Sequence, residues 1–357
     1  MSKKIFKIIN KIKPFKKKIF VESDKSLSIR WVLFSSMSSK KSIALNLLRS
    51  EDVLSAIDCI KKLGSKVKFH SNKCEIIGNG LNYSFKNNLI LNAGNSGTLG
   101  RLLLGLLINS ERKIKLIGDK SLSKRDFSRI TVPLKKFGAK FSSSSNLPLY
   151  IEGLKNPKPI NYFEKKGSAQ VKTSLIMAAL KTKGLSKIKA KKSRTHTEIM
   201  LKNLKVPINI KKTKNFDYIQ VKGVNKISPL YYNIPGDISS SAFFLVLTIL
   251  SKDSELLIKN ININPSRTGI IEILKRMGAN IKIINKKIYK GESVGDILVK
   301  SSKNLKSINC PTKYNSGAID EFLVIFLVAA KSKGISYFKN LSELNHKESP
   351  RLYWSSK

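Results

Sequence analysis

The sequence predicts an α/β protein of two domains, and three observations support this class. The chain has 357 residues, more than one ordinary domain holds. Hydrophobic residues make up 41% of it, enough to build sizeable cores, so a disordered chain is excluded. Stretches typical of buried helices, amphipathic helices and short strands recur with a period of about 72 residues. Such a period indicates repeated α/β units that pack against one another.

Five apolar stretches of helical length mark the repeat. They begin at Ser26, Ser96, Ser168, Ser239 and Gly317, at intervals of 70, 72, 71 and 78 residues. Small or polar residues at these starts are typical of helix N-caps. The stretches are apolar nearly all round, so we expect five buried helices.

A second, amphipathic helix follows each of the first four apolar stretches. These helices close with AIDCIKKLGSKVKF, ITVPLKKFGAKF, IMLKNLKVPINI and IIEILKRMGANIKI. A glycine after the last apolar residue is typical of a helix C-terminus, and the alternating run after it is typical of a strand. In the third copy, Val206 and Pro207 stand in the place of the glycine. Five such units in two domains suggest three plus three with one missing.

Net charge is the most unusual feature of the composition. The chain carries 68 basic and 23 acidic residues, a formal charge of +45. This excess favours either a polyanionic partner or small anionic substrates. Lysine is spread from end to end rather than gathered in one patch with stacking aromatics, so we expect compositional bias and a small anionic substrate, not a nucleic acid.

Cysteines and apolar runs restrict the location of the protein. Cys59, Cys74 and Cys310 lack the spacing of a disulfide framework or a metal site, so we expect reduced thiols. No apolar run is long enough to cross a membrane, and lysines interrupt the first 20 residues. These features predict a cytoplasmic protein.

Polar residues gather where the predicted helices begin. Helix N-termini attract anions, and Arg and Lys beside them would strengthen that attraction. Asp320 and Glu321 open an otherwise apolar helix, and a carboxylate entering a core must be paired or functional. Taken singly, each has an ordinary interpretation: an Arg on the surface, a Ser as a cap, and His196 as a structural histidine.

Taken together and in order, these strings resemble the 5-enolpyruvylshikimate-3-phosphate synthase family. The matching strings are DKSLSIR, GNSGTLGR, SLSKRDFSR, SAQVK, SRTHTE, PGDISSS, NPSRTG, AIDEF and HKESPR. The resemblance runs from about Lys13 to Arg351. It implies an α/β enolpyruvyl transferase fold of two globes built from βαβαββ units, of which five of six are present. One globe would hold residues 23–234, and the other residues 1–22 with 235–357, incomplete at its C-terminus.

The resemblance also implies the reaction and the roles of the residues. The enolpyruvyl group of phosphoenolpyruvate would move to the 5-hydroxyl of shikimate 3-phosphate, and phosphate would leave, without a metal or an organic cofactor. Shikimate 3-phosphate would be bound by Lys25, Ser26, Arg30, Ser168, Gln170, Ser193, Arg194 and Asp320. Phosphoenolpyruvate would be bound by Lys25, Asn95, Gly97, Arg125, Gln170 and Arg351.

Three residues are candidates for the proton transfers that this reaction needs. Addition requires a base for the 5-hydroxyl proton and an acid for the methylene carbon. Asp320 is the candidate base and Glu348 the candidate acid, while Lys25 could serve either transfer. We expect a monomer with small-molecule substrates and no membrane partner.

Three other interpretations compete with this one. The first is an inactive, C-terminally truncated fragment of the same enzyme, because the resemblance stops short of the family's last segment. The second is the enolpyruvyl transferase of UDP-N-acetylglucosamine, which would need a loop cysteine where none of the three occurs. The third is a basic nucleic-acid-binding protein, which the charge suggests and its even distribution disfavours.

Overall fold

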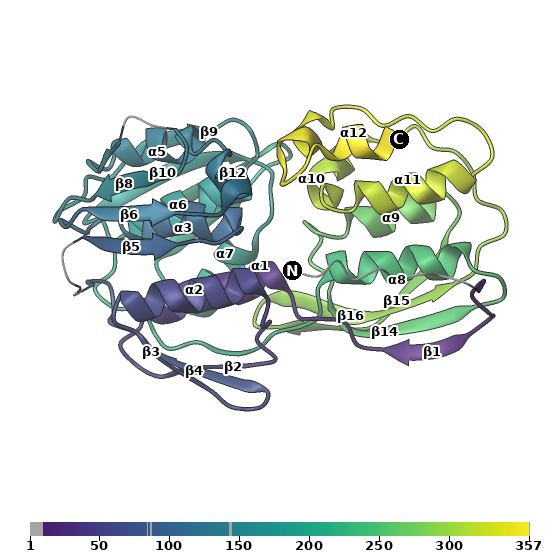
Figure 1. Cartoon of the computed structure of the whole chain (residues 1–357), viewed down its shortest axis with the longest axis horizontal. Helices are drawn as coiled ribbons and strands as arrows, with labels where there is room; N and C mark the ends of the chain where they lie inside the picture. The colour runs from purple at the N-terminus through teal and green to yellow at the C-terminus, as the bar shows by residue number, and fades with distance from the viewer. Residues whose placement is uncertain (1–9, 84, 86–87, 143–144, 357) are drawn as a thin grey trace.

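Two globes lie side by side in the computed structural model of the chain (Figure 1). The structure describes residues 10–83, 85, 88–142 and 145–356. Two separate hydrophobic cores divide these residues, one between Leu27 and Ile234 and the other between Ile238 and Leu344. We call the part around the former the first globe and the part around the latter the second globe. The boundaries expected at residues 22 and 235 stay a prediction, which the separation of the cores supports.

Four four-stranded sheets share one topology. In each sheet an edge strand pairs in parallel with the next strand, and the remaining pairs are antiparallel. Three sheets belong to the first globe: β13 (Tyr231–Asn233), β2 (Ser42–Leu45), β4 (Lys73–Ile77) and β3 (Lys66–Phe69); β5 (Leu89–Asn92), β6 (Ile114–Ile117), β8 (Leu149–Glu152) and β7 (Lys140–Phe141); β9 (Asn161–Glu164), β10 (Leu185–Lys191), β12 (Phe216–Lys222) and β11 (Ile208–Lys212). The fourth is β1 (Lys16–Ile19), β14 (Glu255–Asn262), β16 (Glu292–Lys300) and β15 (Asn280–Tyr289). Repeated topology is the structural counterpart of the repeat in the sequence.

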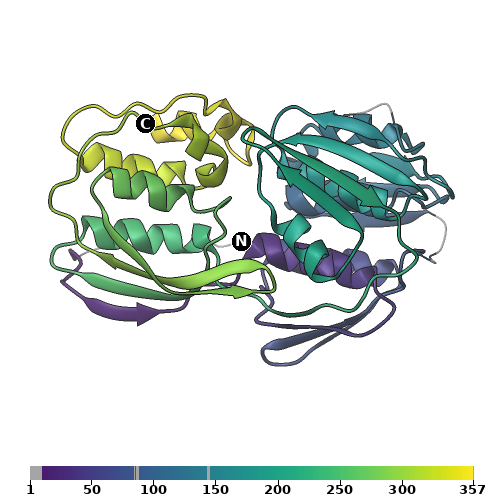
Figure 2. The ribbon, with the colours of Figure 1, turned by 180° about the vertical axis from the view of Figure 1, so that it is seen from behind.

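Exchange of edge strands connects the two globes. Strand β1 precedes the first globe in sequence but completes the sheet of the second, while β13 returns from the third unit to complete the sheet of the first unit. The chain therefore crosses between the globes twice. At the crossings Asp24 N–H donates to the carbonyl of Pro235 (2.8 Å), and Asp237 N–H donates to that of Glu22 (2.9 Å). Figure 2 shows the globes from behind, with the β15–β16 hairpin reaching from the second globe toward the first.

Helices fill the space between the sheets of each globe. The apolar stretches of the sequence form α1 (Lys25–Ser36), α3 (Gly97–Leu106), α6 (Ala169–Leu180), α8 (Ile238–Leu250) and α11 (Phe322–Lys331). The amphipathic helices are α2 (Glu51–Lys62), α5 (Ser128–Lys135), α7 (His196–Asn203) and α9 (Gly269–Arg276). Shorter turns of helix are α4 (Lys120–Ser123), η1 (Thr312–Tyr314), α10 (Asn315–Ala318), η2 (Ser342–His346) and α12 (Arg351–Ser356).

Burial of the five apolar helices differs between the globes. Helices α1, α3 and α6 are buried nearly all round, as expected. In the second globe the expectation is wrong: Phe243 on α8 and Leu327 on α11 are 66% and 55% exposed. The reason is packing, because among the described residues only one four-stranded sheet lies in this globe, and it covers one face of the helix layer.

Three of the five predicted helix starts need correction. Ser96 and Ser168 cap α3 and α6 through their hydroxyl groups, as predicted. Helices α1 and α8 are capped instead by Asp24 and Asp237, whose carboxylates accept from main-chain N–H groups. An aspartate two residues upstream of the predicted serine satisfies these donors at least as well as a serine does.

The fifth apolar stretch is not one helix from Gly317 onward. The short helix α10 ends at Ala318, and α11 begins at Phe322. Asp320 and Glu321 therefore lie in the turn between two helices rather than inside the first turn of one helix. From this turn Asp320 contacts Arg194 of the first globe, while Glu321 is buried and accepts from Ser239 of the second globe.

The turns after the amphipathic helices explain the departure in the third repeat. Gly64, Gly138 and Gly278 follow their helices with φ of +93°, +105° and +90°. After α7 this backbone conformation falls on Lys205, with φ +54°. A lysine adopts the left-handed conformation at an energetic cost that a glycine avoids.

We therefore expect Lys205→Gly to stabilise the protein. Relief of the left-handed strain should exceed the entropy that glycine adds to the unfolded chain, for a net gain of about 0.5–1 kcal/mol in the free energy of unfolding. Chemical denaturation measures this gain. Lys202→Gly, inside the last turn of α7, is the matched control and should destabilise by about 0.5–1 kcal/mol. Equal effects at the two positions would contradict the explanation.

Candidate active site

Oppositely charged side chains from the two globes meet where the helix starts converge. Arg194, just before α7, lies 2.5 Å from Asp320 in the turn before α11. Arg125 of the first globe lies 3.2 Å from Glu348 of the second. Four of the residues singled out in the sequence thus meet in two pairs that bridge the globes. These contacts make the space between the globes the candidate site.

Asp320 is surrounded by cations. Besides Arg194, the Nζ atom of Lys347 lies 3.2 Å and the guanidinium of Arg351 lies 3.6 Å from its carboxylate. Burial pushes the pKa of Asp320 upward, but Arg194, Lys347 and Arg267 outweigh burial and hold the pKa well below its usual value. In this state Asp320 is an ionised carboxylate whose basicity is suppressed by its neighbours.

Glu348 is held in a similar way. Its two carboxylate oxygens contact Arg125 (3.2 Å) and Arg351 (2.9 Å). Partial burial raises its pKa, yet its own main-chain N–H and the two arginines lower it more, so the net shift is downward. Arg351 therefore contacts both candidate proton-transfer residues, Asp320 and Glu348.

The start of α3 is crowded by guanidinium groups. Gly97 is the first residue of this helix, and a Cβ atom placed there would lie 2.7 Å from Arg125 and 3.1 Å from Arg101. Arg101 donates to the Oε1 atom of Gln170 (2.7 Å), and the Nε2 atom of Gln170 donates to Thr98 (3.0 Å). Burial, Arg129 and Arg125 lower the pKa of Arg101 to about 9. Helix N–H groups and two cations thus face the same space, which suits an anion.

The remaining first-globe candidates lie at or near the starts of α1, α6 and α7. Arg30 is buried and donates to Thr197 (2.9 Å) and Thr173 (3.3 Å), and burial together with Arg194 lowers its pKa to about 10. Ser193 is buried, and among the described residues its hydroxyl has no hydrogen-bond partner. A buried hydroxyl without a partner is costly unless a ligand supplies one.

Three candidates have other partners in this structure. Lys25 is half-exposed, and its Nζ atom lies 3.1 Å from Asp52 of α2. Asn95 donates to Asp119 (2.5 Å), and the carbonyl of Ser26 accepts from Arg30 (3.0 Å). The carboxylate of Asp126, which follows Arg125, accepts from Ser128 rather than from Arg125.

Two groups of residues had no assigned role in the sequence. Lys347 belongs to the string HKESPR but was given no function, although it lies 3.2 Å from Asp320. Asp237, Arg267 and Glu321 form a buried cluster beside Asp320. The sequence did point to these three residues, since each belongs to one of the motif strings. What the strings could not show is which of them touch.

A buried pair of one histidine and one glutamate also bridges the globes. His196 of α7 lies 2.7 Å from Glu292 of β16, and both side chains are almost fully buried. Asn264 donates to the same carboxylate (2.8 Å). Burial raises the pKa of Glu292, but His196 and the asparagines outweigh burial and lower it. His196 therefore serves as a contact between the globes, next to the segment that carries Arg194.

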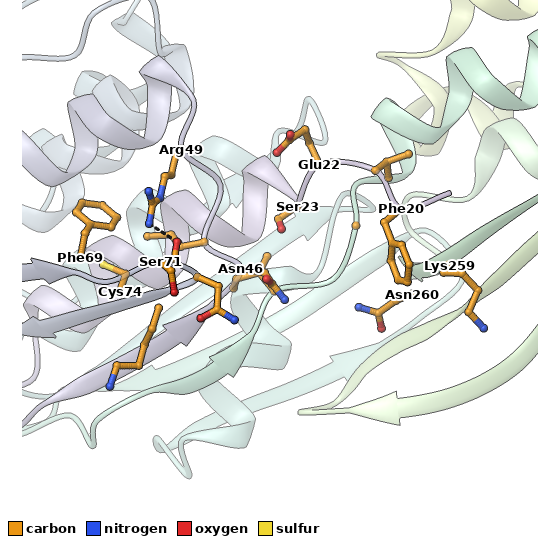
Figure 3. Close-up of a pocket in the computed structure, with 16 residues that line it drawn as sticks. Phe20, Glu22, Ser23, Asn46, Arg49, Phe69, Ser71, Cys74, Lys259 and Asn260 are labelled. Atoms are coloured by element: carbon orange, nitrogen blue, oxygen red, sulfur yellow. Dashed lines mark hydrogen bonds between the residues drawn. The ribbon is translucent and has the colours of Figure 1, made fainter. Parts of the chain in front are cut away.

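One cavity lies at the crossings between the globes. Its volume is about 610 Å³, and it contains none of the predicted site residues. Figure 3 shows Phe20, Glu22 and Ser23 of one crossing, with Lys259 and Asn260 of the second globe and Asn46, Arg49 and Phe69 of the first. Arg49 is occupied by the carbonyl groups of His70 and Ser71. The charged residues of the candidate site therefore lie outside this cavity.

The sequence pattern of the EPSP synthase family, described as 3-phosphoshikimate 1-carboxyvinyltransferase, matches residues 9–356. The chain belongs to the EPSP synthase family. A 3-phosphoshikimate 1-carboxyvinyltransferase of Caldicellulosiruptor saccharolyticus is 43% identical over 340 residues, covering 94% of this chain and 78% of that protein. One of Petrotoga mobilis is 38% identical, with the same coverage. The matches run along nearly this whole chain, so the expected truncation gains no support from them.

Solved structures agree with this membership of the EPSP synthase family. The EPSP synthase of Acinetobacter baumannii superposes with a TM-score of 0.84 at 34% identity, covering 96% of this chain and 77% of that one. The enolpyruvyl transferase NikO of Streptomyces tendae reaches a TM-score of 0.69 at 11% identity, which shows a shared fold alone. The predicted α/β enolpyruvyl transferase fold of two globes is confirmed. No helix among the described residues is long and apolar enough to cross a membrane.

Gly97→Ala tests the anion site at the start of α3. The added methyl would come within 2.7 Å of Arg125, so this guanidinium must move. We expect the KM for phosphoenolpyruvate to rise about 10-fold while the affinity for shikimate 3-phosphate stays unchanged. Gly100→Ala is the control, because the nearest atoms to its methyl would belong to Phe127 and Ala93, at 3.3 Å or more, and not to an arginine. A KM raised equally by both substitutions would refute the assignment of Gly97 and Arg125 to phosphoenolpyruvate.

Proposed function

We propose that this chain transfers the enolpyruvyl group of phosphoenolpyruvate to the 5-hydroxyl of shikimate 3-phosphate and releases phosphate. Membership of the EPSP synthase family supports the reaction. The observation that carries it to particular residues is the pairing of Arg194 with Asp320 and of Arg125 with Glu348 across the globes. Each pair joins an anion-binding cation to a carboxylate suited to proton transfer.

Substrate binding would exchange the partners of these cations. Both substrates carry a phosphate and a carboxylate, and a phosphate competes well for a guanidinium. When the 3-phosphate of shikimate 3-phosphate binds Arg194, Asp320 loses its nearest positive charge and its pKa rises toward the range of a useful base. When phosphoenolpyruvate binds Arg125 and Arg351, Glu348 is released and gains a proton more readily. The ion pairs of the free protein would thus keep both groups inactive until the substrates arrive.

The chemical steps follow from these positions. Asp320 would take the proton of the 5-hydroxyl while the oxygen of this hydroxyl attacks C2 of phosphoenolpyruvate. Glu348 would give a proton to the methylene carbon. The tetrahedral product would then lose its phosphate, with a proton removed from the methyl group to restore the double bond. Lys25, at the start of α1, could assist either transfer once its contact with Asp52 opens. Ser168, Ser193, Arg30 and Gln170 would hold shikimate 3-phosphate on the first globe, and Asn95 would support phosphoenolpyruvate.

A direct assay tests this function. The purified chain with both substrates should release phosphate and form an enolpyruvyl ether, seen by NMR as new vinyl proton signals. Omission of shikimate 3-phosphate should abolish phosphate release. Phosphate release without this acceptor, or no release with both substrates, would contradict the proposal. UDP-N-acetylglucosamine in place of shikimate 3-phosphate should give no product.

We further propose that the protein works as a cytoplasmic monomer without a nucleic-acid partner. The spread of its 68 basic residues along the whole sequence supports the absence of a nucleic-acid partner. Light scattering measures the mass in solution. A salt-sensitive gel shift with RNA that persists in saturating shikimate 3-phosphate would contradict it.

A further inference from the structure

Arg267 is the most deeply buried arginine near the site, and the proposed chemistry does not use it. Its side chain is 2% exposed. The guanidinium donates to Asp237 (3.0 Å) and Ser239 (2.8 Å) and lies 3.5 Å from Asp24. Burial would lower its pKa, but Asp237, Asp24 and Glu321 outweigh burial and raise it, so Arg267 stays charged.

The partners of Arg267 begin corresponding helices in the two globes. Asp24 caps α1, the first helix of the first globe, and Asp237 caps α8, the first helix of the second. Each residue also lies at one of the two chain crossings. One guanidinium group thus contacts the helix caps of both globes at the place where the globes are connected.

The hydrogen bonds of Arg267 to Asp237 and Ser239 both lead to residues proposed for catalysis. On one side, the second carboxylate oxygen of Asp237 accepts from the main-chain N–H of Lys25 (3.1 Å). On the other side, the hydroxyl of Ser239 accepts from Arg267 and donates to Glu321, the neighbour of Asp320. Glu321 is buried, and burial raises its pKa. Arg267 therefore connects the backbone that carries Lys25 to the turn that carries Asp320.

We propose that Arg267 is a positioning residue that sets Lys25 and Asp320 relative to each other across the crossings. The inference rests on the proposed function and adds to it a residue that touches neither substrate nor reacting atom. A buried ion pair adds little net stability over well-packed apolar residues in its place, so stability alone does not account for this arrangement. Here the forked guanidinium meets two aspartates and a serine at defined angles, and an ammonium group cannot reproduce this geometry.

Two substitutions test the proposal through steady-state kinetics. Arg267→Lys keeps the charge but loses the fork, and we expect kcat to fall about 100-fold, the effect of a displacement near 1 Å. The Kd for shikimate 3-phosphate should stay within about threefold, because the first globe supplies most of its proposed contacts. Ser239→Ala removes only the hydroxyl between Arg267 and Glu321, is expected to fold, and should lower kcat about 10-fold. Ser251→Ala, at the other end of α8, is the control.

Hydrogen exchange gives a readout that does not depend on turnover. If Arg267 positions both segments, Ser239→Ala and Arg267→Lys should speed amide exchange at residues 24–27 and 319–323 together. Exchange in the part of α8 that follows Ser239 should stay unchanged. A kcat within threefold of wild type in folded Arg267→Lys and in Ser239→Ala would overturn the proposal, as would faster exchange on one side alone. A wild-type chain that releases no phosphate would count against the proposed function, and the exchange pattern would still decide the role of Arg267.

Discussion

Asp320→Asn should lower kcat by a factor of about 10²–10⁴, which is the usual contribution of a general base. An amide keeps the shape of the side chain and can still contact Arg194, but it cannot accept the proton of the 5-hydroxyl. Binding of shikimate 3-phosphate should be weakened yet measurable, because the first globe supplies most of its proposed contacts. Phosphate release measures kcat, and calorimetry measures the Kd.

Asp253→Asn is a matched control for this substitution. Asp253 is exposed, lies 3.9 Å from the exposed Lys303 and, among the described residues, contacts no residue of the candidate site in any ion pair, so the same change of group should leave kcat unaltered. If Asp320→Asn turned over within about 10-fold of wild type, the base would have to be another residue.

Stability should respond to pH at the same residue. The pKa of Asp320 is lower in the folded protein than its ordinary value of 3.8, since its cationic neighbours outweigh burial. A depressed pKa stabilises the folded state above the unfolded-state pKa, and this stabilisation is lost as the pH falls through the folded-state pKa. Asp320→Asn should therefore lower the melting temperature of the free protein at neutral pH and do so less below pH 3.8. A melting-temperature difference that is constant over this range would show that Arg194 and Lys347 do not stabilise the carboxylate.

Regular features of the fold were predictable because they depend on local patterns. The spacing of Ser96 and Ser168 gave two helix starts correctly, and the apolar stretches gave the five helical segments. The starts at Ser26 and Ser239 were wrong because local pattern does not decide between adjacent capping residues, and Asp24 and Asp237 cap instead. The break before Phe322 was missed because acidic residues such as Asp320 and Glu321 are also favourable in the first turn of a helix, so they did not indicate a turn.

Which residues of the candidate site contact one another was less predictable than which residues belong to it. Motif strings brought Arg194 and Asp320 into one proposed site although 126 positions separate them. Their contact depends on how closely the globes approach, which no local pattern encodes. The same holds for Arg267, whose function requires both crossings to be in place. The motif strings and the family resemblance thus supply the candidate residues, while the ion pairs between them appear only in the folded molecule.

Arg194→Ala should act first on the affinity for shikimate 3-phosphate. Removal of a guanidinium from a largely desolvated phosphate contact is expected to cost about 2–4 kcal/mol of binding free energy. Its side chain is 17% exposed in the free protein, so little water could replace it. Arg194→Lys should recover part of the loss, because the charge remains while the forked geometry is gone. Arg112→Ala, an arginine of the same globe beside Phe85, is the control and should bind normally.

A double-mutant cycle with Asp320→Asn separates binding from the masking of the base. Arg194 and Asp320 are in contact, so their effects on unfolding stability should not add. Their effects on the Kd should not add either, because in the wild type the phosphate must displace Asp320 from Arg194. We expect the loss in affinity from Arg194→Ala to be larger in the Asp320→Asn background, where Arg194 has no carboxylate to leave. An equal loss in both backgrounds would mean that the phosphate and Asp320 do not compete for Arg194. An unchanged affinity in Arg194→Ala itself would place the phosphate elsewhere.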